Sequence, residues 1–296
     1  MDSPQLTNTE GSVPLSILIP ILNEARLLPR ILDSISQLKV DVYILDSGST
    51  DGSIEIAKTY CCQIVQGEWG SFSEKLNWGL SNLPFKTGWV MRLDADEFLT
   101  KEFIDQIGPT LISMDDAVDG LIVGRRIKFL GKWLRFGGMY PLEHLRITRV
   151  GRAHYENRLL DEHVHVPGKT IRISMDIIEE DTKGLVNWSR KQAGYAETEC
   201  FIHYNSLAKE KTWATLSGSA RWRRFLKEEI YARAPLFIRP LGFWFYRYIL
   251  LLGFLDGIPG FIFHFLQAFW YRFLVDALIF EAKVTAGSSV KKSHVI

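Results

Sequence analysis

The alternation of short apolar runs with amphipathic segments between Leu15 and Asp96 limits the possible folds of this chain more than any other feature. Apolar runs at 15–22, 40–45, 62–66 and 89–96 have the length of buried strands, and residues with helical spacing fill the stretches between them. Strand–helix alternation is typical of a mostly parallel α/β sheet flanked by helices. We therefore expect an α/β fold whose ligands bind beyond the carboxyl ends of its strands.

Polar residues gather where these predicted strands end. Asn23-Glu24 follows the first strand, the turn-rich segment from Asp46 to Asp51 follows the second, and the strand starting at Trp89 ends in Asp94-Ala-Asp96. We expect Asn23 to be a helix N-cap. In an extended strand, residues i and i+2 point to the same side, so Asp94 and Asp96 would aim two carboxylates at one point. Such oxygen ligands suit Mg²⁺ or Mn²⁺.

Several other functions are disfavoured by what the sequence lacks. There is no G-x-G-x-x-G after the first strand and no G-x-x-x-x-G-K-[ST], which disfavours dinucleotide-binding and P-loop enzymes. The formal charge of +1 gives no global attraction to nucleic acid. Cys61, Cys62 and Cys200 form no disulfide framework, and residues 1–13 lack the pattern of a signal peptide. We therefore expect a protein that stays in the reducing cytosol.

The three polar segments, taken in order, resemble a known family. The series Pro20-x-x-Asn23-Glu24, Asp46-Ser-Gly-Ser-Thr-Asp51-Gly and Asp94-Ala-Asp96-Glu97 is similar to the donor half of GT-A family 2 glycosyltransferases. The resemblance implies a GT-A (Rossmann-like) fold and a nucleotide-sugar donor. It implies Asp96 as a metal ligand, with Asp94 on the ribose or the metal. The expected nucleoside contacts are Pro20, Asn23, Glu24, Asp46 and Asp51.

The same resemblance suggests two further donor contacts. Lys75 and Asn77, near the start of the third predicted helix, match the family's phosphate and sugar contacts. A solvated helix lysine is the alternative for Lys75.

A second acidic cluster matches the catalytic base of related lipopolysaccharide and exopolysaccharide glycosyltransferases. An inverting transfer needs a carboxylate that takes a proton from the acceptor hydroxyl. Glu162 matches the position of that base, just before a Val-x-Val strand, and Asp161 is the second candidate. The Asp-x-His-x-His pattern from Asp161 to His165 leaves a metal site as an alternative. The resemblance also implies a His, a possible third metal ligand, at the position of Glu179. Here Glu179 could bind the cation in its place, or the site could keep an extra water instead.

The C-terminal part has a different character. Residues 211–247 carry eight Lys/Arg against two Glu, and the run 221–227 is basic and rich in aromatic residues. Residues 240–280 are intensely apolar, but no stretch reaches the ~18 uncharged apolar residues of a spanning helix. Gly257, Pro259 and Gly260 predict two helices joined by a turn. We expect them to lie in or dip into one leaflet at the cytoplasmic side of the inner membrane, as a peripheral or monotopic part.

We divide the chain accordingly. The expected parts are a disordered N-terminus (1–13), a GT-A catalytic domain (14–207) with donor (14–100) and acceptor (101–207) halves, membrane-associating helices (208–284) and a disordered tail (285–296). The predicted activity is metal-dependent inverting transfer, with Mg²⁺ or Mn²⁺, from a nucleotide-sugar donor to a lipid-linked or lipopolysaccharide acceptor at the cytoplasmic membrane face. A sugar nucleotidyltransferase and a non-catalytic nucleotide-sugar-binding protein at the membrane are the alternatives.

Overall fold

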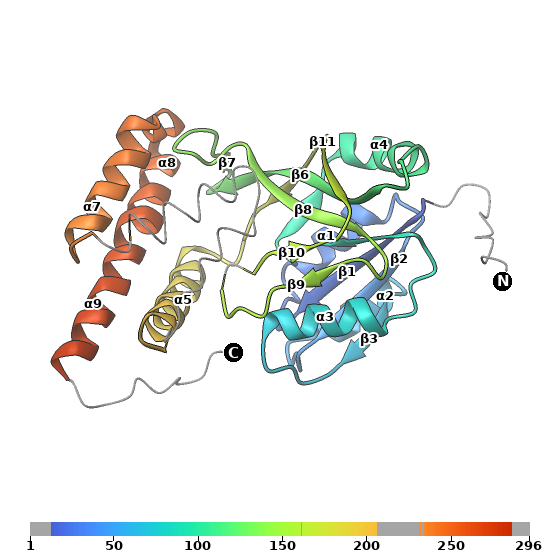
Figure 1. Cartoon of the computed structure of the whole chain (residues 1–296), viewed down its shortest axis with the longest axis horizontal. Helices are drawn as coiled ribbons and strands as arrows, with labels where there is room; N and C mark the ends of the chain where they lie inside the picture. The colour runs from blue at the N-terminus through green and yellow to red at the C-terminus, as the bar shows by residue number, and fades with distance from the viewer. Residues whose placement is uncertain (1–12, 161, 206–230, 232–233, 286–296) are drawn as a thin grey trace. The chain divides into compact units, whose positions relative to one another are not determined.

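The computed structural model describes residues 13–160, 162–205, 231 and 234–285 (Figure 1). It divides into two compact units. The sheet unit holds Met1–Leu134 and Met139–Gly184, and the helical unit holds Arg135–Gly138 and Leu185–Ile296. The basic run 221–227 and Asp161 lie outside the described residues, as do nearly all residues of both expected disordered ends.

The first half of the sheet unit is parallel, as the alternation predicts. β1 (Leu15–Ile21) pairs in parallel with β2 (Asp41–Asp46) on one side and with β4 (Trp89–Arg92) on the other. β3 (Gln63–Gln66) extends the sheet beyond β2. Because β1 is central, both of its faces are buried, which explains its continuous apolar sequence.

The second half makes the sheet mixed. β8 (Leu142–Arg149) runs antiparallel to both β4 and β6 (Val118–Phe129), and β11 (Lys169–Glu179) lies parallel to β6. β5 (Glu97–Leu99) closes the edge antiparallel to β11. Two short additions complete the strands: β7 (Lys132–Trp133) pairs with β6, and β9 (His154–Tyr155) forms a separate ribbon with β10 (Val164–His165).

Helices cover both faces of this sheet. The odd-numbered residues of β1 pack in one cluster with α1 (Leu28–Ile35), α2 (Ser53–Thr59) and α4 (Lys101–Ile112). Leu18 points the other way and packs in a cluster with Leu76 of α3 (Phe72–Asn82). The period-two alternation of strand side chains thus divides the core between the two faces.

The expected cap at Asn23 is wrong. α1 begins five residues later, with Leu27 at its N-cap position, and Asn23 has a positive φ of 55°. The Asn23 side chain instead accepts a hydrogen bond from the Thr50 amide at 2.8 Å. Asn tolerates this left-handed backbone better than most residues, so it serves a tight turn here rather than a helix start.

The helical unit contains α5 (Leu185–Asn205) and a helical hairpin. The first arm consists of α7 (Ile238–Phe245) and the π-helix η4 (Tyr246–Leu250), and η5 (Gly253–Asp256) lies at the turn. The second arm consists of α8 (Gly257–His264), η6 (Phe265–Trp270) and α9 (Tyr271–Val284). Pro259 lies in the first turn of α8, where its missing N–H costs nothing, so the break falls earlier than the sequence indicates.

One helical stretch among the described residues, Gly253–Val284, is long and apolar enough to cross a membrane, judged by length and composition alone.

Candidate functional site

The three polar segments meet at one edge of the sheet unit. Ile21 at the end of β1 is in register with Asp46 at the end of β2, and β4 runs parallel to β1 on its other side. Parallel strands end on the same edge, so the residues that follow them are brought together as predicted. Pro20 is buried in β1 opposite Leu45, beyond the point where pairing with β4 ends.

Asn23 and the loop after β2 hold each other in place. The Asn23 amide nitrogen donates to Ser49 Oγ at 2.8 Å, while its side-chain oxygen accepts from the Thr50 amide. The Glu24 amide donates to Ser53 Oγ at 2.8 Å, and Lys183 Nζ lies 2.6 Å from the Glu24 carboxylate. The two loops therefore form one hydrogen-bonded rim.

Asp51 acts as the connector in this rim. Its carboxylate accepts hydrogen bonds from the amides of Ala25 and Ser53, at 3.0 and 3.1 Å. Burial tends to raise the pKa of Asp51, but the hydrogen bonds from Ser53 and Ala25 outweigh it and lower the pKa. The charged carboxylate is therefore the form that the loop stabilises.

Asp46 is fully buried, and its carboxylate is enclosed by donors. It accepts from Gln66 Nε2 at 3.0 Å and from the amides of Gly48 and Ser49, and the Ser49 hydroxyl also donates to it. Burial tends to raise the pKa of Asp46, but these hydrogen bonds outweigh burial and lower it. The ionised side chain thus fixes the shape of the loop that follows β2.

Lys75 is a buried lysine, so the alternative of a solvated helix residue is wrong. Its Nζ donates to the Ile21 carbonyl and to Ser47 Oγ, both at 2.8 Å, and thereby joins the ends of β1 and β2 to α3. Burial lowers the pKa of Lys75 to about 8, although the nearby Asp46 carboxylate opposes this shift. This cation lies at the rim where the resemblance places the donor phosphates.

Asn77 faces a different element. Its Nδ2 donates to the Tyr155 carbonyl at 3.0 Å, and its Oδ1 accepts from the Tyr155 amide at 2.8 Å. Asn77 therefore holds β9 against α3 in this structure, and its predicted contact with the donor stays a prediction.

The Asp-x-Asp segment is a turn and not a strand end, which corrects the expectation of extended geometry. β4 stops at Arg92, and the Glu97 amide donates to the Asp94 carbonyl at 2.9 Å. The Glu97 side chain accepts from the Asp94 amide at 3.0 Å and closes the turn from within. Asp94 and Asp96 are both half-buried, but this turn sets their directions.

Two arginines hold Asp94. Arg92 binds it in bidentate fashion, with nitrogen–oxygen distances of 2.9 and 3.0 Å, and Arg146 contacts the same carboxylate at 3.2 Å. Burial tends to raise the pKa of Asp94, but Arg92 and Arg146 hold it well below its usual range. Arg146 also pairs with Glu97, which is 1% exposed, and burial raises the pKa of Glu97 against the opposing charge of Arg146.

The second acidic cluster reaches the first through Arg92. Arg92 Nη1 lies 3.4 Å from the Glu162 carboxylate, so Asp94 and Glu162 share one guanidinium. Arg92 is also enclosed by aromatic rings, with its Cζ 4.7 Å from the Phe72 ring centroid. Asp161, the second candidate base, lies outside the described residues. β10 begins at Val164, so strand alternation does not decide which way Glu162 points.

The alternative metal site in the second cluster gains no support. His165 Nε2 lies 2.9 Å from the Glu156 carboxylate. Among the residues that the structure describes, no group of three or more His, Cys, Asp and Glu side chains is placed to hold a metal ion.

The end of β11 lies beside Asp96. The Glu180 amide donates to the Asp96 carbonyl at 2.8 Å, and Glu179 is in register with Glu97 of β5. The Glu179 carboxylate lies 2.7 Å from Arg125 Nη1. Glu179 is therefore brought to the same edge as Asp96, but its carboxylate faces Arg125.

Arg92 and Arg146 are the site residues that the sequence analysis missed. Arg92 ends a strand whose other residues are apolar, and Arg146 stands between Leu145 and Ile147 in β8; 12% and 6% of their side chains are exposed. A charged residue within a buried strand needs a partner, and this is the signal that could have identified them.

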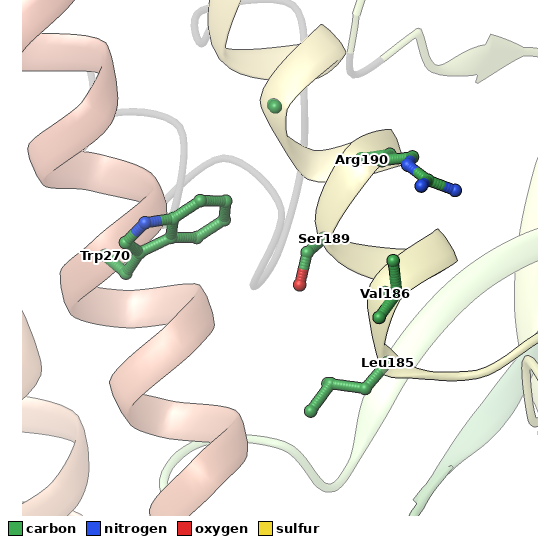
Figure 2. Close-up of a pocket in the computed structure, with 6 residues that line it drawn as sticks. Leu185, Val186, Ser189, Arg190 and Trp270 are labelled. Atoms are coloured by element: carbon green, nitrogen blue, oxygen red, sulfur yellow. The ribbon is translucent and has the colours of Figure 1, made fainter.

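A hollow lies in the helical unit. Figure 2 shows Trp270 directed toward α5, which supplies Leu185, Val186 and Ser189 to the lining. Arg190 is the one ionisable side chain in this lining, and no carboxylate is present. This hollow therefore lacks the ligands of a nucleotide-sugar site.

Comparisons with known proteins give matches over most of the chain. The family model "Glycosyl transferase family 2" matches residues 16–225. The chain is 25% identical over 276 residues to the lipopolysaccharide core biosynthesis glycosyltransferase LpsC of Rhizobium meliloti (strain 1021), covering 86% of this chain and 91% of the relative. An uncharacterized glycosyltransferase of Rickettsia prowazekii (strain Madrid E) is 30% identical over 93 residues, or 31% of each chain.

Among solved structures, the chain resembles glucosyl-3-phosphoglycerate synthase from Mycobacterium tuberculosis in complex with Mn²⁺, UDP and glucosyl-3-phosphoglycerate. The TM-score is 0.33 at 22% identity, and the match covers 43% of this chain and 50% of that one. The matched family model covers the whole rim described above, and the expected GT-A type of α/β fold with its C-terminal apolar helices is confirmed. The nucleotidyltransferase and non-catalytic alternatives are set aside, and the chain belongs to glycosyltransferase family 2.

Proposed function

We propose that this glycosyltransferase moves a sugar from a uridine diphosphate sugar to a lipid-linked or lipopolysaccharide saccharide, with inversion, at the cytoplasmic face of the inner membrane. The observation that carries the proposal is the convergence of three strand ends on one rim, where Asp94 and Glu162 share Arg92. Residues far apart in the sequence thereby meet, which supports a donor site beside a candidate base. The name of the Rhizobium relative supports the lipopolysaccharide acceptor.

In this proposal the rim from Pro20 to Asp51 binds the nucleoside. The Asp46 and Asp51 carboxylates are ionised and fix the loop, which leaves its backbone groups in a defined shape for the base and ribose. Lys75 presents a buried positive charge next to the same loop. A preformed rim of this kind lowers the entropy cost of ordering a bound donor.

The Asp-x-Asp turn is the part of the rim where we place a divalent ion. Both Asp94 oxygens already accept hydrogen bonds from Arg92 and Arg146, and the family resemblance implies Asp96 as the metal ligand. Mg²⁺ and Mn²⁺ are often held by one or two carboxylates together with substrate phosphates and water. We therefore place Asp96 as the ligand, with Glu179 as a neighbour, and Asp94 as the anchor of Arg92 and Arg146. Such an ion would supply positive charge to the departing diphosphate.

Glu162 would take the proton of the acceptor hydroxyl as its oxygen attacks the anomeric carbon. The ion pair with Arg92 would hold its carboxylate toward the donor site. General base catalysis of this kind is worth ~10²–10⁴ in rate.

Asp96→Asn tests the proposal directly. We expect the variant to keep its fold and to lose sugar transfer, because the amide is a weaker ligand for a hard cation. The measurement is a donor screen with UDP-, GDP- and dTDP-sugars, with and without Mn²⁺, on wild type and variant. Transfer near the wild-type rate by Asp96→Asn would remove the metal from the proposal, and turnover of only GDP- or dTDP-sugars would remove uridine.

A further inference from the structure

The helical hairpin from Phe237 to Phe280 has its polar groups inside and its apolar groups outside. Every exposed residue in this fully described stretch is apolar, glycine or tyrosine. Ile258 at the turn end is 76% exposed, and Leu250 on the first arm is 61% exposed. Soluble monomers expose apolar residues singly or in limited patches, so a continuous apolar exterior requires a covering medium.

The charged residues of the hairpin face inward, and each has a partner in the helical unit. Asp276 is 0% exposed, pairs with Arg239 and accepts from the Phe237 amide at 2.7 Å. Arg272 Nη1 lies 2.9 Å from the Glu199 carboxylate of α5. Ion pairs that face the interior of a helix bundle are the arrangement found for ionisable residues at membrane depth.

The charged residues near the turn of the hairpin are also buried and also have hydrogen-bond partners. The Asp256 carboxylate is 1% exposed and accepts from the amides of Arg135 and Phe136 at 3.0 and 2.9 Å. Arg247 donates to the Gly137 carbonyl at 2.8 Å and to Gln267 at 2.6 Å. The segment Arg135–Gly138 thus supplies hydrogen-bond partners to the charges nearest the turn, where a hydrocarbon environment would penalise unsatisfied groups most.

The lengths of the two arms show whether the hairpin can span the bilayer or only enter one leaflet. The first arm, Ile238–Leu250, is about 20 Å long at 1.5 Å per residue, which is shorter than the ~30 Å hydrocarbon core of a bilayer. The second arm is longer, but its exposed charged residues, Glu281 and Lys283, come only after Phe280. A hairpin with such arms can enter one leaflet and return, but its first arm cannot cross.

We propose that the hairpin Phe237–Phe280 is embedded in the hydrocarbon of one leaflet as a re-entrant anchor, with the turn from Leu252 to Ile258 at its deepest point. The partner is the lipid bilayer itself. A helix lying flat at the interface would carry charged residues on its outer side, and this hairpin carries none there.

The test uses the full chain and vesicles of phosphatidylethanolamine and phosphatidylglycerol. We expect wild type to stay with the vesicles in high salt and in alkaline carbonate. Ile258→Asp should lower the vesicle partition coefficient by roughly a hundredfold, because it places a charge at the deepest point. An Asp in the first turn of α8 also suits the helix dipole, so the variant should fold. Ile112→Asp is the matched control, since Ile112 is 69% exposed in the sheet unit, and it should partition as wild type does.

Three results would overturn the proposal that the hairpin is embedded in the bilayer. Release of wild type by salt or carbonate would show a peripheral contact. Equal partitioning of the two Asp variants would show that the turn does not enter the bilayer. A stable dimer without vesicle binding, broken by Ile258→Asp, would show that a second copy covers the apolar face. Donor hydrolysis, measured without vesicles on the same samples, reports the proposed sugar transfer separately.

Discussion

Replacing Arg146 tests whether the arginine pairs are what holds the Asp94–Glu97 turn. Arg146 is 6% exposed along its side chain and contacts the carboxylates of both Asp94 and Glu97. In Arg146→Gln, Asp94 keeps its bidentate partner Arg92, whereas the only cation left beside Glu97 among the described residues is Arg125 at 3.9 Å, in addition to the hydrogen bond from the Asp94 amide. The variant therefore leaves the buried Glu97 carboxylate with only a weak opposite charge nearby.

The expected cost follows from that remaining pair. Breaking a buried ion pair by removing one partner costs ~3–5 kcal/mol. Because Arg125 retains part of the attraction, we expect a loss of about 3 kcal/mol in the free energy of unfolding, at the low end of this range. As a control, Arg172→Gln removes an exposed pair with Glu143 at 3.1 Å, where 54% of the Arg172 side chain is exposed, and should cost less than about 1 kcal/mol.

The pH dependence has a definite sign. Burial already raises the pKa of Glu97 above 4.5, and loss of Arg146 raises it further. A carboxyl whose folded-state pKa is raised loses stability as pH rises from its unfolded value through its folded value. The cost of Arg146→Gln should therefore be smaller at about pH 5.5 than at about pH 8.

The assay is urea unfolding monitored through hydrogen exchange at the β4 and β8 amides, so that it reports the stability of the sheet unit alone. Adding Glu97→Gln to Arg146→Gln should recover most of the loss, because a neutral amide oxygen can still accept from the Asp94 amide. The reasoning is refuted if Arg146→Gln costs no more than Arg172→Gln, or if the double variant is as unstable as the single one.

Two further predictions concern the base and the buried lysine. Glu162→Gln should keep donor affinity and lower turnover by ~10²–10⁴. Arg92→Lys should lower both donor affinity and turnover, because Arg92 also holds Asp94. Isothermal titration with UDP measures the affinity, and steady-state kinetics measure the turnover. If Asp161→Asn is the inactive variant and Glu162→Gln is not, the base is misassigned. Lys75 has a folded-state pKa of about 8, against an ordinary value of 10.5. Between these pH values the unfolded chain keeps the lysine proton that the folded chain has lost, so the free energy of unfolding rises with pH in this range. The wild-type advantage over Lys75→Met should grow by about 3 kcal/mol from pH 8 to 10.5 in urea titrations, and a pH-independent difference would contradict the buried cation.

The sequence alone determined the order of the strands' polar ends and the division of the chain into an α/β part and an apolar helical part. Both depend on local pattern and on residue types within a few positions, such as the continuous apolar run of β1 and the acidic residues after Arg92. These signals can be recognised in the sequence alone because each helix or strand is built from residues that are neighbours along the chain.

Only the tertiary structure decided which charges meet. Arg92 contacts Glu162 across 70 positions, and Arg146 contacts Glu97 across 49. The same holds for the hairpin, where Asp276 faces Arg239 and the surface is left to apolar side chains. A buried charge requires a partner but does not specify which one, because pairing energies depend on distances in space that spacing along the chain does not encode.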